Sequence, residues 1–476
     1  MDIVDAISSP GTTLATVSLV ACVGGFVVLL HILLSRPKAL YHIRSFLQSS
    51  SRESPKKLSD TDYSTVFPPS QRPVLGQLIP VASPGRDLSV SPRPVLPLDS
   101  NYLSAPSSSY VYSGFTVKEI KALGNFPDYS ILSGVPHPTP LKQFDIDKAL
   151  PRPYRPFRWS YHQTMSFKKL ETDFWIELES TYRERVRQRQ ALFAQHGKDV
   201  LQALPGSELA CKELMEMVLQ FICIRYPNCF QLKGNVFINH VLGTKDDLSA
   251  KDPLLVLLDN VPEDFGISLR DHQTGRYMLR AGVICSSVDW NLGEKIGLGL
   301  PAIHKRVPDY KEKMELSMDR FFTKMPANGP IQRGSWGLEM GQPLYLPPGS
   351  EAVEHREHQR PDLQPDEVHL RVDWQTLRRL PLSGAIVFNF KALFTPLSEF
   401  KDEPYIPSLI LKILNEGNEG IMKYKGTWHV EHVAKPVLEE YERYQIAQGL
   451  MKPEWEPATL DESPFFPGWE RKWNLH

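Results

Sequence analysis

The sequence predicts an α+β fold, and three observations lead to this prediction. Residues 369–374 alternate polar and apolar side chains, which is the two-residue period of a β-strand with one buried face. After a turn at Pro381–Gly384, the apolar run Ala385–Phe394 is expected to pair back with that strand. Apolar residues spaced four apart within residues 170–196 predict an amphipathic helix. Because strands and helices are mixed irregularly, an α+β arrangement is favoured over a doubly wound one.

Further elements are expected in the same globular unit. A second helix begins after Ser207, which is a suitable N-cap. A third begins after Asp309, with Glu312 as its partner in a capping box. Strands are expected at Phe230–Phe237, Leu254–Leu258 and Met278–Ser286.

The N-terminal segment is expected to cross a membrane. Residues 14–34 are almost entirely apolar, and about 20 such residues span a bilayer as a helix. A cleaved signal peptide is the alternative, but the acidic residues Asp2 and Asp5 stand where a positive segment is typical. Basic residues follow the apolar run and none precedes it, so the positive-inside rule places the rest of the chain in the cytosol. We therefore expect a single-pass protein anchored through residues 14–35, in the endoplasmic reticulum membrane.

Composition predicts the remaining organisation. Residues 1–13 form a short segment before the anchor. Residues 36–113 are rich in proline and serine and are expected to form a linker, because they can bury too little apolar surface to fold alone. Residues 114–451 are expected to form one globular domain. Residues 452–476 make an aromatic tail that is expected to pack on that domain.

Charge and cysteine content narrow the classes of partner. The formal net charge is −1, and no basic stripe indicates a nucleic-acid partner. An odd set of 5 cysteines fits reduced thiols in the cytosol better than a disulfide framework. A membrane-anchored glycosyltransferase remains an alternative, since an anchor before a Pro/Ser-rich stem is its usual layout and Asp145 and Asp147 form an Asp-x-Asp sequence. That enzyme would face the lumen, against the flanking charges.

The predicted strand carries a candidate catalytic site. The polar positions on one of its faces are His369, Arg371, Asp373 and Gln375. A solvated strand face is one explanation for this row. The row contains an imidazole, a guanidinium, a carboxylate and an amide but no lysine, serine or threonine, and this chemistry is more typical of a site.

A further candidate is His304, in an apolar loop between Pro301 and Pro308. A lone histidine in such a loop is often a structural residue of the core. The same surroundings also suit a neutral imidazole that ligates heme iron, because an apolar environment excludes water. The chain has no phosphate-binding loop and no nucleophile elbow.

These segments resemble the heme-dependent oxidative N-demethylase-like family, called HRQ after a His-Arg-Gln pattern. His369, Arg371 and Gln375 match that pattern here. The matching segments are His369–Pro381, Ser383–Phe388, Val288–Gly297 with His304 after it, and Thr164–Glu171. The resemblance extends from about Pro136 to Lys425, so the predicted anchor and linker lie outside it.

The resemblance implies a heme b enzyme with a PAS-like antiparallel sheet core, surrounded by helices, that acts as an oxidoreductase of the monooxygenase type. It implies one histidine ligand to the iron, which we assign to His304, with His369 as the alternative. Arg371, Arg378 and Arg379 would then neutralise the heme propionates through bidentate contacts.

The resemblance also implies oxidative N-demethylation of a small-molecule substrate with oxygen, and electrons from an external reductase, because this chain has no flavin or iron–sulfur motif. Asp373 would hold a cationic amine. In bacterial relatives the corresponding position looks like a glutamate. The shorter aspartate and the neighbouring Trp374 indicate a larger or different substrate than a small alkylamine, such as a compound of secondary metabolism. A non-catalytic heme or small-ligand sensor on the same fold is the alternative.

Overall fold

The computed structural model of the chain describes residues 95–160 and 165–473. The expected anchor at residues 14–35 and the expected linker up to residue 94 lie outside the described residues. Within the described ranges, no helix is both long enough and apolar enough to cross a membrane.

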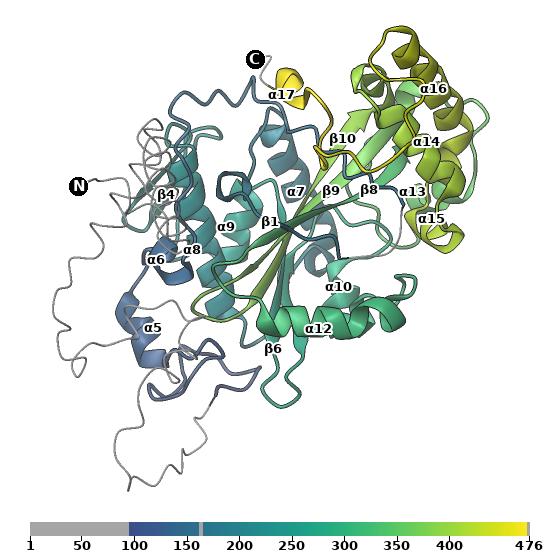
Figure 1. Ribbon diagram of the computed structural model, residues 1–476. Coiled ribbons are helices and arrows are strands. Elements are labelled where there is room, and N and C mark those ends of the chain that lie inside the picture. The colour runs from purple at the N-terminus through teal and green to yellow at the C-terminus, as the bar shows by residue number, and fades with distance from the viewer. Residues whose placement is uncertain (1–94, 161–164, 474–476) are drawn as a thin grey trace, which may run out of the picture. The chain divides into compact units, whose positions relative to one another are not determined.

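The described chain contains a large antiparallel sheet with helices on both faces, which confirms the predicted α+β class (Figure 1). The sheet is 7-stranded, in the order β1-β8-β9-β10-β6-β7-β2. Its strands are β1 (Lys168–Lys169), β8 (Ile331–Met340), β9 (Val368–Arg379), β10 (Ile386–Pro396), β6 (Asp264–Arg270), β7 (Tyr277–Val283) and β2 (Leu201–Ala203). A separate 3-stranded sheet contains β3 (Phe230–Lys233), β4 (Val236–Asn239) and β5 (Thr244–Asp247).

The predicted hairpin is present as β9 and β10, which pair antiparallel along almost their full lengths. Arg371 lies opposite Phe394, and Gln375 lies opposite Phe390. The expected exposure of the polar face is wrong, because nearly every residue of β9 is buried. Helices cover both faces of the sheet, so both the polar and the apolar rows of this strand lie inside the protein.

Three groups of helices cover the sheet (Figure 1). The face that carries the even-numbered residues of β9 packs against α7, α8 and α9 at one end and against α14 and α16 at the other. The opposite face packs against α10, α11 and α12. These helices are α7 (Tyr182–His196), α8 (Glu208–Arg225), α9 (Pro253–Asn260), α10 (Leu292–Lys295), α11 (Leu300–Ile303), α12 (Glu315–Lys324), α14 (Ile406–Glu416) and α16 (Trp428–Ala447). The shorter helices are α5 (Val117–Leu123), α6 (Tyr129–Ser133), α13 (Glu351–Glu354), α15 (Glu419–Lys425) and α17 (Trp469–Trp473).

The structure differs from the predicted elements in two respects, the strands and the helix ends. Phe230–Phe237 forms parts of two paired strands, β3 and β4, in place of one strand. The apolar run Leu254–Leu258 lies in helix α9 and not in a strand. Asp252 caps this helix by accepting hydrogen bonds from the N–H groups of Leu254 and Leu255, and Pro253 follows in the first turn. A short apolar run has no periodicity of its own that separates a buried helix from a strand, so the cap decides the outcome here.

The other difference concerns helix ends. The helix expected within residues 170–196 begins only at Tyr182. Asp309 forms no capping box, because it adopts a left-handed conformation (φ 55°) and is followed by a π-turn at Tyr310–Met314 before α12. The helix predicted after Ser207 is confirmed as α8.

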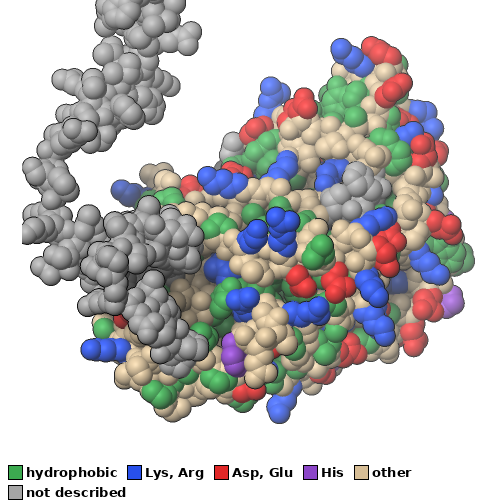
Figure 2. Space-filling view, turned by 60° about the horizontal axis from the view of Figure 1, so that its bottom comes forward, with side chains coloured by type: hydrophobic (Ala, Val, Ile, Leu, Met, Phe, Trp, Pro, Cys, Tyr) green, Lys and Arg blue, Asp and Glu red, His purple; other side chains and the backbone are tan. Residues whose placement is uncertain are grey.

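Segments at both ends of the described chain pack on this body. Tyr102 and Val111 belong to the main hydrophobic core. Near the C-terminus, Phe466 is buried and the Trp469 ring stacks on Phe465 with 4.0 Å between centroids. The indole N–H of Trp473 donates to the Leu150 carbonyl at 3.1 Å. On the face shown in Figure 2, basic and acidic side chains are interspersed and not gathered by sign.

A buried carboxylate ties the β9–β10 turn to helix α8. Glu213 accepts hydrogen bonds from the backbone N–H groups of Leu382 and Ser383 and is fully enclosed by the protein. Burial raises the pKa of Glu213 to about 7, although these hydrogen bonds act in the opposite direction. The turn between the two longest strands is therefore fixed by a group that titrates near neutral pH.

The substitution Glu213→Gln is expected to flatten the pH dependence of stability. The folded chain keeps a proton on Glu213 that the unfolded chain releases near the usual pKa of 4.5. Between that pH and about 7, the free energy of unfolding therefore falls as pH rises, by up to about 1.4 kcal/mol per pH unit. Urea denaturation at several pH values should show a smaller fall for Glu213→Gln than for the wild type. Glu184→Gln, an exposed change of the same kind on α7, should keep the wild-type slope, and equal slopes in all three proteins would contradict the assignment.

Candidate functional site

The predicted polar row lies on one face of β9 but does not converge on one point. His369 and Gln375 are six residues apart, which corresponds to about 20 Å along a strand. The structure therefore divides the row into three parts. Arg371 pairs with Asp373, His369 lies at the start of the strand, and Gln375 lies near its centre.

Arg371 is a buried cross-link between the sheet and two loops. Its Nε donates to Asp373 Oδ1 at 3.0 Å, and its Nη1 donates to the Pro343 carbonyl at 2.9 Å and to the Leu344 carbonyl at 3.3 Å. Its Nη2 donates to the Ser286 carbonyl. Each guanidinium nitrogen thus has a partner within the protein. Asp373 keeps 27% of its side chain exposed, so the carboxylate is the accessible member of the pair.

His369 has partners at both ring nitrogens. Nδ1 lies 3.1 Å from the Glu367 carbonyl oxygen, so this nitrogen is the donor. Nε2 lies 3.4 Å from the amide nitrogen of Gln342, which places an N–H donor at its lone pair. The side chain is 9% exposed. These contacts hold the imidazole in place without leaving a free nitrogen for a metal.

His304 has the complementary arrangement. It follows helix α11, and its Nδ1 lies 2.8 Å from the Leu300 carbonyl oxygen in the preceding turn, so Nδ1 carries the proton. Its ring stacks on Tyr310 with 4.8 Å between centroids and a 7° angle. Nε2 therefore keeps its lone pair, on a ring whose orientation is fixed. This is the state in which an imidazole ligates a metal.

Charge and burial keep the His304 ring neutral. Burial is the main cause that lowers its pKa, and the nearby cations Arg333 and Lys295 lower it further. Arg333 belongs to strand β8 and lies opposite Gln375, on the face covered by α10 to α12. Sequence reasoning missed Arg333, because β8 (IQRGSWGLEM) has no clear alternation.

Apolar side chains surround this part of the sheet. One buried cluster combines residues of β7, β10 and α10 with aromatic neighbours, and a second combines α11, the π-turn and α12. The first contains Leu279, Ile284, Leu292 and Phe390, packed against Trp290, Ile296, Ile303 and Phe388. A neutral imidazole with a free Nε2, next to apolar walls and to the cations Arg333 and Lys295, fits the needs of an iron porphyrin with anionic propionates.

The arginines predicted to contact the propionates lie apart from one another. Arg378 and Arg379 are adjacent on β9, so their side chains point to opposite faces of the sheet. Arg379 donates to the backbone carbonyls of Met325, Phe322 and Gly384, which fixes the end of α12. Arg378 is 6% exposed and stacks on Trp175, with 3.9 Å from its guanidinium carbon to the ring centroid. Burial lowers the pKa of Arg378 to about 9.

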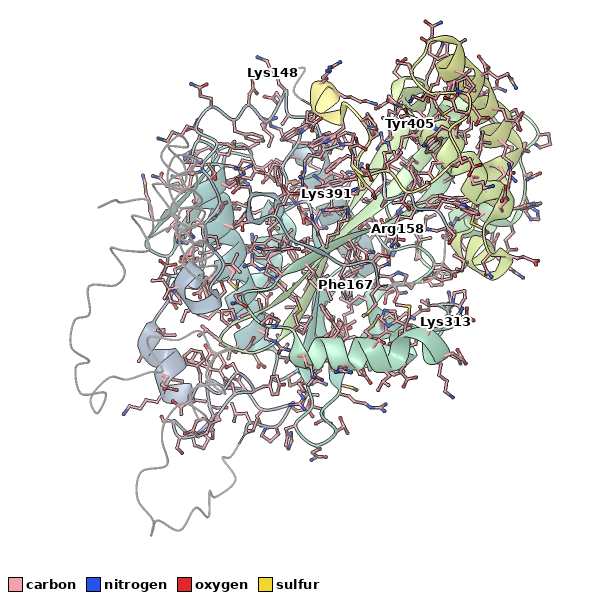
Figure 3. All side chains as sticks on the ribbon, viewed as in Figure 1. Lys148, Arg158, Phe167, Lys313, Lys391 and Tyr405 are labelled. Carbon is pink, nitrogen blue, oxygen red and sulfur yellow. The ribbon has the colours of Figure 1, made fainter. Side chains whose placement is uncertain are left out.

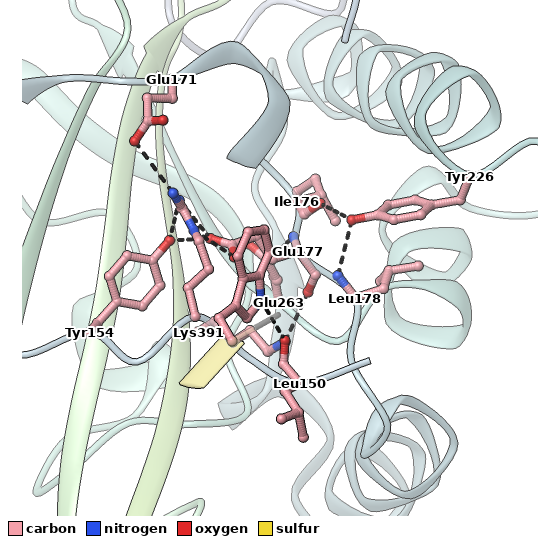
Figure 4. A network of polar contacts seen from close by, with 11 residues as sticks. Leu150, Tyr154, Glu171, Ile176, Glu177, Leu178, Tyr226, Glu263 and Lys391 are labelled. Carbon is pink, nitrogen blue, oxygen red and sulfur yellow. Dashed lines mark hydrogen bonds and ion pairs between the residues drawn. The ribbon is translucent and has the colours of Figure 1, made fainter. Parts of the chain in front are cut away.

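A polar network that the sequence did not suggest lies on the even-numbered face of the sheet (Figure 4). Arg152 binds both carboxylate oxygens of Glu177, at 3.1 and 3.2 Å, and the Tyr154 hydroxyl donates to Glu177 as well. Lys391 donates to the Glu177 carbonyl at 2.8 Å. Burial raises the pKa of Glu263, in the same network, to about 7. These residues are far apart in sequence, so no local pattern marks them.

No group of three or more His, Cys, Asp or Glu side chains that could hold a metal ion occurs within residues 95–160 and 165–473. A metal bound to this part of the chain would therefore have at most two ligands from these side chains, and a cofactor could supply the other donors. His304 is a described histidine whose contacts suit that role.

The substitution Arg371→Lys is expected to destabilise the protein by about 2–4 kcal/mol, because lysine cannot reproduce the fork of bonds to Asp373 and to the three carbonyls. Denaturant unfolding of the cofactor-free chain measures this loss separately from any effect on a ligand. Arg187→Lys, an exposed change of the same kind on α7, should stay within about 0.5 kcal/mol of the wild type. A similarly small effect for Arg371→Lys would contradict the cross-linking role.

The sequence was compared with models of known protein families. A family model described as haem-dependent oxidative N-demethylase, alpha subunit-like, matches residues 166–435. The matched region contains His304, Arg333, the whole of β9 and β10, and helices α7 to α15, and it is more than half of the chain. The chain therefore belongs to the haem-dependent oxidative N-demethylase alpha subunit-like family, as the resemblance predicted.

Proposed function

We propose that this protein is a heme-dependent oxidoreductase that removes a methyl group from the nitrogen of an N-methylated amine. The observation that carries the proposal is the state of His304, a partly buried imidazole whose Nδ1 is bound to a carbonyl and whose pKa is lowered mainly by burial, so that Nε2 keeps its lone pair. Family membership supports the heme dependence and the class of reaction. In this proposal the cofactor is heme b, and His304 is its protein ligand in preference to His369.

The topology supports a PAS-like core. If strands β6 to β10 are numbered 1 to 5 in chain order, their order in the sheet is 2-1-5-4-3, which is the order of a PAS sheet. Helices α10, α11 and α12 lie between the second and third of these strands, as PAS helices do. His304 follows α11 in this helical segment, and its ring stacks on Tyr310, which belongs to the second apolar cluster described above. A cofactor between segment and sheet would be shielded from water.

The protein's own residues take distinct roles in this proposal. The bound heme would supply the oxidative chemistry, while the protein supplies orientation and electrostatics. Asp373 is proposed to hold the cationic amine, because its carboxylate is the accessible one in the polar row and lies on the face that carries Gln375. Arg371 fixes the position of Asp373 through a hydrogen bond, and His369 binds the Glu367 carbonyl at the start of the strand.

The reaction requires partners outside this chain. Demethylation of R₂N–CH₃ by O₂ consumes two electrons and two protons and yields R₂NH, formaldehyde and water. We propose that an external reductase delivers these electrons, and that the N-terminal apolar segment anchors the enzyme in the endoplasmic reticulum membrane with its catalytic domain in the cytosol. A substrate larger than a simple alkylamine is proposed, because an aspartate replaces the longer acid expected at this position.

The substitution His304→Ala is expected to abolish the heme Soret band of the purified full-length protein, because the iron loses its protein ligand. Added imidazole should restore the band by filling the space left by the side chain. His369→Ala, a matched change on the same face of the sheet, should retain the band. The opposite pattern would assign the iron to His369, and a colourless wild type after heme supplementation would refute the proposal.

Turnover is tested with NADPH, a reductase and a panel of N-methylated amines, with formaldehyde as the readout. Asp373→Asn is expected to lower kcat/KM by about 10- to 100-fold, since it removes the charge that holds the amine. Asp366→Asn, at an exposed site near the same strand, should leave kcat/KM unchanged. Ligand-dependent spectral shifts without any formaldehyde would indicate a sensor in place of an enzyme.

A further inference from the structure

A small cavity at one end of the sheet is lined by cations. Its walls come from α7, from the loops before β6, after β7 and after β8, and from β10. The lining residues are Arg185, Arg189, Pro262, Ser286, Leu344, Lys391 and Ala392. Lys391 lies between the α7–α9 helices and the α14–α16 helices (Figure 3). Within the part of the chain that the structure describes, no aspartate or glutamate is among these lining residues.

Arg189 presents unpaired donors at this cavity. Its side chain is 2% exposed, and its Nη1 donates to Asp264 Oδ1. Nε and Nη2 are buried and have no hydrogen-bond partner among the described residues. Asp264 cannot satisfy them as well, because it already accepts from the N–H groups of Cys285 and Ser286 and from the Ser286 hydroxyl. Buried donors without an acceptor are costly, so an acceptor is expected here.

The other two cations leave the balance positive. Lys391 is neutralised by Glu179, whose Oε1 lies 3.0 Å from Nζ. Arg185 donates to the neutral side chain of Gln188 at 3.2 Å, and no carboxylate of the described chain forms an ion pair with it. Burial lowers the pKa of Arg185, and Arg371 lowers it further, while Glu179 acts in the opposite direction from beyond ion-pair distance. Three cations line the cavity, and two carboxylates, Asp264 and Glu179, form ion pairs with them. One positive charge therefore has no carboxylate in an ion pair with it.

We propose that this cavity binds a small monoanion, specifically a carboxylate group, between the guanidinium groups of Arg185 and Arg189. Guanidinium groups bind planar carboxylates through paired hydrogen bonds, and the enclosed walls favour such a contact over hydration. The single uncompensated positive charge and the planar guanidinium groups favour a planar monoanion such as a carboxylate over a tetrahedral dianion such as sulfate.

The anion site adjoins the proposed reaction site. Ala392 is the cross-strand partner of Asp373, and Arg371 donates to the carbonyl of Ser286, another lining residue. The carboxylate therefore has two possible sources. It belongs either to a free small organic acid or to a propionate of the heme, and the second source rests on the function proposed above.

Sodium acetate is the probe, and the readout is the thermal unfolding midpoint of the full-length protein in detergent, with sodium chloride at matched ionic strength as the baseline. Acetate is expected to raise the midpoint of the wild type in a saturable manner. In Arg185→Gln, the acetate concentration that gives half of this rise should increase about tenfold or more. Arg187→Gln, at the neighbouring exposed position of α7, should behave like the wild type.

Repeating the titration after heme loading separates the two sources. If acetate loses its effect on the loaded wild type, a heme propionate occupies the site, whereas an unchanged effect identifies a free carboxylate. An equal acetate response in all three heme-free proteins, or a response to sulfate as strong as that to acetate, would overturn the proposal. None of these outcomes depends on demethylation, so the anion site can fail while the proposed function stands, and the reverse also holds.

Discussion

The central constraint on this structure is that strand β9 is buried on both faces, including the face that carries its polar row. A polar group that loses water on folding must find a partner inside the protein, or the fold loses stability. Arg371 and Arg379 meet this requirement by donating to backbone carbonyls of loops and helix ends that would otherwise be unpaired. The strand therefore organises the surrounding segments, because their carbonyls must be placed where its guanidinium groups are.

The same requirement separates the groups that are free for chemistry from those that hold the fold. Arg371, Arg379 and His369 have their hydrogen-bonding capacity filled by neighbours. Asp373 keeps one accessible side, and His304 keeps one free nitrogen. Charge also differs across the sheet. Around His304 the neighbouring ions are cations, whereas the network of Glu177 and Glu263 lies on the face packed against α7 to α9.

The sequence predicted the parts of the fold that depend on local patterns. The β9–β10 hairpin combines a two-residue period with a turn, and α8 begins after Ser207 at the N-cap position, so both were expected, although the Ser207 hydroxyl donates to the Leu204 carbonyl and does not cap the helix. The apolar run in α9 is too short to show a period. The burial of the polar row depends on helices distant in the sequence, which no local pattern reports.

The candidate site could be predicted only in part, for related reasons. His304 was visible because an apolar loop around a lone histidine is unusual. The two histidines differ in their contacts. Nδ1 of His304 contacts Leu300 and leaves Nε2 free, whereas both ring nitrogens of His369 contact neighbours, Glu367 and Gln342. Spacing in the sequence alone does not determine these contacts. Arg333 was missed because its strand has no regular alternation, although it lies directly opposite Gln375.

The hydrogen bond from His304 to Leu300 lies within a single helical turn and requires no residue from the rest of the fold. The orientation of the imidazole is thus encoded by a few consecutive residues. Substitutions that reshape the surroundings of Asp373 on β9 can accumulate without rotating this ring. Such modularity offers evolution a route by which relatives diversify the surroundings of β9 while the orientation of this imidazole stays constant.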